Sequence, residues 1–168
     1  GSFFGTVAAV PFILTGPLGQ RPEDVGFYFA IMMLANAVGL FAVGRVLPRW
    51  GAARTAPIGS WCSVVGLAGF LVLMLTGTLT VTTLLIALSV YNFGCGFLFP
   101  GALTGAIDVD ARRVGAAAGL FSFSVQAVGI VSATLVGLWQ NDLALGIGII
   151  GVGMTATGRL ALLLARRA

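Results

Sequence analysis

Residues 55–107 read TAPIGSWCSVVGLAGFLVLMLTGTLTVTTLLIALSVYNFGCGFLFPGALTGAI, 53 consecutive residues without a charged side chain. As a single helix this stretch would be about 80 Å long, whereas the hydrocarbon core of a bilayer is about 30 Å thick. The stretch is therefore predicted to cross a membrane twice, with one turn between the crossings. The turn is expected at residues 76–80, where Gly77 and three threonines weaken a helix.

Charge-free runs also flank this stretch on both sides. Residues 1–20, 25–44 and 114–141 carry no charge, and a last apolar segment follows Asp142 and contains Arg159 in its final third. One crossing needs about 20 apolar helical residues. We therefore predict an all-α integral membrane protein with six transmembrane helices in a single bundle, near residues 3–15, 25–47, 57–75, 81–105, 114–139 and 144–165.

The composition agrees with this class and excludes several functions. Of the 168 residues, 58% are hydrophobic and 8% are charged, whereas soluble domains are about 25% charged. The chain has no histidine, which removes Ser/His dyads and His-ligated metal sites, and Cys62 and Cys95 lie in apolar runs. We expect no enzymatic activity, no metal and no cofactor.

The arginines indicate lipid rather than nucleic acid as the surroundings, and they orient the chain. They occur one to three at a time between apolar stretches, without a basic patch. The connection before residue 25 holds only Arg21, whereas eight arginines lie after the second and fourth predicted helices and near the C-terminus. Because cytoplasmic connections retain arginine, both termini are predicted to be cytoplasmic.

The first helix is short, and the chain begins without Met. The residues before the Gly16-Pro17 break supply only about 22 Å of helix. We therefore expect the chain to be a piece of a longer protein.

Two matches within the sequence predict an internal duplication. Phe4-Gly5 followed by Pro11 matches Phe93-Gly94 followed by Pro100, at an offset of 89. The segment NAVGL at residues 36–40 matches QAVGI at residues 126–130, at an offset of 90. A unit of three helices is odd in number, so its second copy enters from the opposite side. The fold is thus predicted as two inverted three-helix repeats, about residues 1–76 and 80–168.

Several motifs resemble one transporter family. The stretch GRVLPRWGAAR at residues 44–54 resembles the cytoplasmic loop signature of the major facilitator superfamily, although Gly44 stands where the fuller signature has an acidic residue. The segments FGCGFLFP at residues 93–100 and RVGAAAGL at residues 113–120, with Gln126 after them, resemble helices ten and eleven of the bicyclomycin-resistance type of drug:proton antiporter.

This resemblance implies a C-terminal six-helix half of a secondary active transporter, a multidrug or small-molecule exporter of the bacterial cytoplasmic (inner) membrane. Its implied partners are membrane lipid, the N-terminal six-helix half, a small-molecule substrate and protons. All five acidic residues fall in or beside predicted loops, so the proton-coupling acid is expected in the other half. Import of a metabolite by the same scaffold, and a self-sufficient six-helix channel or transporter acting as a homo-oligomer, are the alternatives.

Polar and aromatic residues inside the predicted helices are the candidates for a substrate cavity. An unpaired amide in hydrocarbon is costly, so amide side chains should face the bundle or a wet cavity. A hydrogen bond between helices, with no role in substrate binding, would explain a buried amide equally well. For Asn36 this is the better explanation. The candidates are Asn36, Asn92, Gly96, Phe99, Phe123 and Gln126.

A second set of candidates concerns gating and helix packing. The resemblance implies that Arg45, Arg49 and Arg54 pair with acids such as Asp108 to close the cytoplasmic side; arginines that only fix topology are the alternative. The spacing of Gly115 and Gly119 predicts a close approach between helices. Bends are predicted at Pro11 and Pro100.

Overall fold

The computed structural model describes residues 2–107, 114–138 and 143–165, and these form six α-helices joined by short connections. Their bounds lie within a few residues of the predicted ones. The helices are α1 (Ser2–Thr15), α2 (Pro22–Trp50), α3 (Ala52–Leu75), α4 (Val81–Ile107), α5 (Val114–Leu138) and α6 (Leu143–Ala165).

The connection between α2 and α3 differs from the prediction. Instead of a loop over residues 48–56, a single residue, Gly51, joins the two helices with a φ of 71°. Its N–H donates to the carbonyl of Leu47 at 2.9 Å, which ends α2. Pro48 lies inside α2, because a proline near a helix end removes only one backbone hydrogen bond. The segment that resembles a loop signature is therefore almost entirely helical.

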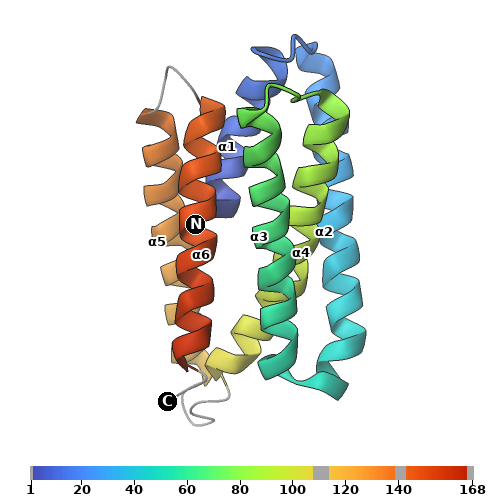
Figure 1. Cartoon of the computed structure of the whole chain (residues 1–168). Helices are drawn as coiled ribbons and strands as arrows, with labels where there is room; N and C mark the ends of the chain where they lie inside the picture. The colour runs from blue at the N-terminus through green and yellow to red at the C-terminus, as the bar shows by residue number, and fades with distance from the viewer. Residues whose placement is uncertain (1, 108–113, 139–142, 166–168) are drawn as a thin grey trace.

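The helices pack mainly in two groups. Within one group α4 lies against α3 and α2, and within the other α1 lies against α5 and α6; α3 and α6 also contact each other. Figure 1 shows the α2–α3 connection and the end of α6 at the same end of the bundle, with the α3–α4 connection at the opposite end. The arginines of the α2–α3 corner thus lie at the end where α6 finishes, as the charge pattern predicts.

Two glycines allow α3 and α4 to pack closely. A Cβ at Gly66 would collide with the backbone N of Tyr91, and a Cβ at Gly94 would collide with the backbone N of Ser63. This contact buries the Tyr91 side chain completely, together with Phe70. The core extends from there to α1 and α2 and includes Ile13, Leu14, Met32, Leu67, Leu84 and Leu88.

Four helices in the described part of the chain are long and apolar enough to cross a membrane: α2, α3, α4 and α5. α1 is apolar but has only 14 residues, and in Figure 1 it begins near the middle of the bundle. Large apolar side chains point outward, including Phe41 (66% exposed) and Leu138 (72% exposed). Water would disfavour such a surface, and lipid tails accept it. The chain is an all-α membrane protein; the prediction of six crossings goes beyond these four helices.

Both prolines expected to bend helices lie inside helices, Pro11 in α1 and Pro100 in α4. In Figure 1 the last, yellow part of α4 runs at an angle to the rest of that helix. A proline within a helix removes one hydrogen bond and clashes with the preceding turn, which accounts for a bend at this place.

Candidate functional site

A large cavity of the described structure has a volume of about 910 Å³, and residues of all six helices line it. Sequence candidates from three different helices line it: Asn36 from α2, Gly96 and Phe99 from α4, and Gln126 from α5. The other side chains at its wall are Ser2, Phe3, Phe4, Leu40, Ser60, Ser63, Tyr91, Cys95, Leu98, Ala102, Phe121, Val125, Val128, Met154, Thr155, Thr157 and Gly158.

The wall of this cavity is mostly apolar and contains no charged side chain. Phe99 and Phe121 meet edge to face across α4 and α5, with ring centroids 5.4 Å apart. The amides of Asn36 and Gln126 and a few hydroxyl groups provide the polar points. Sites of this volume, with aromatic walls and few polar groups, bind small apolar or amphipathic molecules.

Asn36 both lines the cavity and forms a hydrogen bond between helices, the two alternatives that the sequence leaves open. It lines the cavity, and its Nδ2 donates to the backbone carbonyl of Asn92 at 3.0 Å, which joins α2 to α4. Gly96 likewise lines the cavity and packs against α2, because a Cβ at this position would collide with the backbone carbonyl of Asn36. A structural role therefore accompanies any role in binding at both positions.

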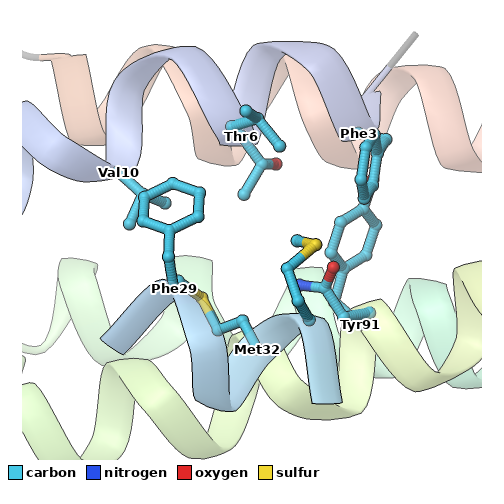
Figure 2. A pocket seen from close by; sticks show the side chains of 9 residues that line it. Phe3, Thr6, Val10, Phe29, Met32 and Tyr91 are labelled. Carbon is cyan, nitrogen blue, oxygen red and sulfur yellow. The ribbon is translucent and has the colours of Figure 1, made fainter. Parts of the chain in front are cut away.

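Asn92 and Phe123 are not among the residues that line the large cavity, so their predicted role at a substrate stays a prediction. Asn92 is only 3% exposed, and its Nδ2 donates to the carbonyl of Leu88 at 2.8 Å. It faces a separate, small cavity between α1, α2 and α4 instead (Figure 2). Phe123 is 70% exposed on α5.

The candidate gate is only partly described. Arg45 and Arg49 lie in the last turns of α2, and Arg54 lies in the first turn of α3. The guanidinium of Arg45 lies 3.6 Å from the centre of the Phe41 ring, and none of the three arginines forms an ion pair with a described residue. Asp108 lies outside the described residues, so the latch stays a prediction.

Gly115 and Gly119 do not bring helices together within this chain. A Cβ at either position would meet no atom within 4 Å, since this end of α5 is exposed. Close approaches occur instead on α2, at Gly39 against Phe93, and on α5, at Gly129 against Phe4. The spacing of small residues predicted the kind of contact but not its position.

Sequence reasoning missed two polar contacts near the cavity. The Ser2 and Tyr91 hydroxyl groups lie 2.8 Å apart and link α1 to α4. Arg159 of α6 places its guanidinium 3.6 Å from the centre of the Trp61 ring of α3. Polar side chains in otherwise apolar helices were the available signal, but no spacing within one helix shows which neighbour they meet.

Groups of three or more His, Cys, Asp or Glu side chains that could hold a metal ion do not occur among the described residues. The fold and the cavity together define an all-helical membrane protein with an open cleft large enough for a small molecule.

Comparison with known proteins narrows this class. No family model and no solved structure matches the chain. Over 164 residues it is 26% identical to a protein of Bacillus subtilis (strain 168) named Uncharacterized MFS-type transporter YdgK, and the match covers 96% of this chain and 40% of that protein. The chain therefore spans about two fifths of this relative's length. The similarity supports the major facilitator superfamily, and a transporter rather than an enzyme.

Proposed function

We propose that this chain is the C-terminal six-helix half of a major facilitator exporter of small, drug-like molecules that works by alternating access. The observation that carries the proposal is the cavity of about 910 Å³, which all six helices border. Its aromatic wall and uncharged amides suit apolar or amphipathic substrates better than sugars or ions, which need many hydrogen-bonding or charged groups.

The packing supports two inverted repeats. Under the offsets of 89 and 90, Gly39 corresponds to Gly129 and Phe93 corresponds to Phe4. The two close glycine contacts join these corresponding residues: Gly39 with Phe93 between α2 and α4, and Gly129 with Phe4 between α5 and α1. The contacts differ in kind, because Gly39 meets the backbone of Phe93 whereas Gly129 meets the aromatic ring of Phe4. The pairing of corresponding residues nevertheless supports a duplicated three-helix unit.

The helix neighbours follow the same rule. Under the duplication, α1, α2 and α3 correspond to α4, α5 and α6. The contacts of α4 with α2 and α3 therefore correspond to contacts of α1 with α5 and α6, which are the main contacts of α1. The contact between α3 and α6 is unchanged by the exchange. In transporters built in this way, two six-helix halves rock about a site near the membrane midplane.

The proposal also includes an N-terminal six-helix half and the coupling of transport to protons. The match covers only 40% of the relative, so the relative has room for further helices outside the matched part. The described acids, Glu23 and Asp24, lie exposed in the first turn of α2, away from the cavity wall. A titrating group for proton coupling would therefore be supplied by the N-terminal half.

The proposal is tested by expressing this chain with and without the six upstream helices of its parent protein in nanodiscs. A fluorescent, lipophilic cation serves as the substrate probe. The proposal requires that the two halves associate and that only the pair binds the probe and exports it from vesicles. A homo-oligomer of this chain that moves the probe unaided would overturn it in favour of a self-sufficient six-helix transporter.

A further inference from the structure

One buried polar atom has no partner among the described residues. The Oδ1 atom of Asn92 lies buried without a hydrogen bond, although the Nδ2 atom of the same side chain is satisfied by Leu88. The whole side chain is 97% buried, since only 3% of it is exposed. An unsatisfied carbonyl oxygen in such a place costs about 1–3 kcal/mol, so a partner is expected.

The space next to Asn92 is a separate cavity of about 10 Å³ between α1, α2 and α4. This volume is close to that of a single water molecule's probe sphere. Figure 2 shows Thr6 reaching toward it from α1, opposite Met32 of α2. The remaining wall is apolar or aromatic: Phe3, Val7, Val10, Phe29, Met33 and Tyr91.

The polar groups of this cavity are acceptors. The Thr6 hydroxyl donates its hydrogen to the carbonyl of Ser2 at 2.9 Å, which leaves the lone pairs of its oxygen free to accept. The Oδ1 atom of Asn92 is also an acceptor. A ligand here must donate two hydrogen bonds, fit a space of about 10 Å³ and carry no charge, because no acidic side chain lines the cavity.

We propose that this cavity is a binding site for one structural water molecule, which donates one hydrogen bond to Asn92 Oδ1 and one to Thr6 Oγ1. The water joins α1 to α4 at a residue that is already joined to α2, because the Asn92 carbonyl accepts from Asn36. Asn92 of α4 is thus connected to α2 directly and to α1 through the water. A metal cation is excluded by the donor set, since two oxygens surrounded by methionine and phenylalanine provide too few ligands.

Radiolytic hydroxyl labelling of the full-length protein in nanodiscs tests the proposal. Radicals formed from a bound water modify the side chains beside it, so Met32 is expected to be labelled although it is only 1% exposed. Trp50, half-exposed at the end of α2, serves as the internal reference. Absence of label on Met32 in the unaltered protein overturns the proposal.

Two variants remove the proposed partners one at a time. Thr6→Val and Asn92→Leu keep the approximate shape of each side chain, and each should abolish labelling of Met32 while Trp50 stays labelled. Thr15→Val is the matched control, because Thr15 makes the same bond to the carbonyl four residues earlier but is exposed at the end of α1. Labelling of Met32 that persists in folded Thr6→Val protein overturns the site even where Asn92→Leu does not fold.

Discussion

The hydroxyl oxygens of Ser2 and Tyr91 lie 2.8 Å apart, and the two residues are 89 positions apart in the sequence. This separation equals the offset that relates Phe4 to Phe93 and Pro11 to Pro100. Under the proposed duplication, Ser2 and Tyr91 are therefore counterparts that touch each other. A residue can touch its own counterpart only at the axis that relates the two copies, so this hydrogen bond marks the centre of the bundle, where α1 meets α4.

The first prediction concerns this hydrogen bond. Ser2→Ala and Tyr91→Phe should each lower the free energy of unfolding by about 0.6 kcal/mol, the average for an interhelical hydrogen bond in a membrane. The free energy of unfolding of the double variant should fall by no more than the larger of the two single decreases, because both substitutions remove the same hydrogen bond. Thermal unfolding in detergent micelles measures all three values.

A matched control comes from Tyr28, whose hydroxyl donates to Gln20 at 2.9 Å at another place in the fold. Tyr28→Phe combined with Ser2→Ala should give the sum of the two single effects, since distant sites act independently. If the two single effects at Ser2 and Tyr91 also added up in the double variant, the two hydroxyl groups would not be bonded to each other.

The second prediction separates packed glycines from exposed ones. Gly96→Ala places a Cβ into the backbone of α2 at Asn36 and should destabilise the protein by about 1–3 kcal/mol or prevent folding. Gly119→Ala meets open space and should be neutral or stabilise by up to about 1 kcal/mol, because alanine favours a helix. Unfolding of both variants in the same detergent provides the comparison, and equal stability of the two would contradict the α2–α4 contact.

The sequence predicts the helices of this protein well because charge-free runs and Gly or Pro breaks are local signals. It misses the α2–α3 corner, since Arg45 and Arg49 suggest a loop although the backbone stays helical up to Gly51. The basic side chains lie at the end of a helix, where they can reach the headgroups without a loop.

The cavity is harder to predict because it depends on how each helix is rotated. Asn92 and Gly96 share one face of α4 by spacing, yet Gly96 borders the large cavity and Asn92 faces the small one. The boundary between these cavities is the fully buried ring of Tyr91, which lines both. The backbone of Tyr91 lies close to Gly66 of α3, a contact that no pattern within α4 reveals.

The third prediction concerns Arg159 and Trp61. The guanidinium and the indole ring are 3.6 Å apart, and a cation–π contact contributes about 0.5–1 kcal/mol at exposed sites. Trp61→Leu should remove this amount, whereas Trp61→Phe should retain part of it. In an Arg159→Gln background both changes should have the same small effect, which a double-mutant cycle in nanodiscs would measure. A Trp61→Leu loss that is the same in both backgrounds would argue that the ring only packs.

The fourth prediction follows from the cavity wall, where none of the described residues is acidic. In the full-length protein, Glu23→Gln and Asp24→Asn should each leave proton-coupled export unchanged, because both side chains are exposed in the first turn of α2. The same outcome is expected for each of the other three acids, Asp108, Asp110 and Asp142. Export driven by an imposed pH gradient is the measurement, and loss of export in one well-expressed variant would move the coupling group into this half.

The last prediction tests which residues touch the substrate. Phe99→Ala and Gln126→Ala alter the α4 and α5 parts of the wall of the large cavity, and each should lower export of the lipophilic probe by about tenfold, the effect of losing roughly 1.4 kcal/mol of binding. Phe123→Ala removes an equally large aromatic side chain that is 70% exposed and does not border the cavity, so export should be nearly unchanged. Protein amounts in the membrane must be matched before the rates are compared. A larger loss for Phe123→Ala than for Phe99→Ala would place the substrate outside this cavity, on the exposed surface of α5.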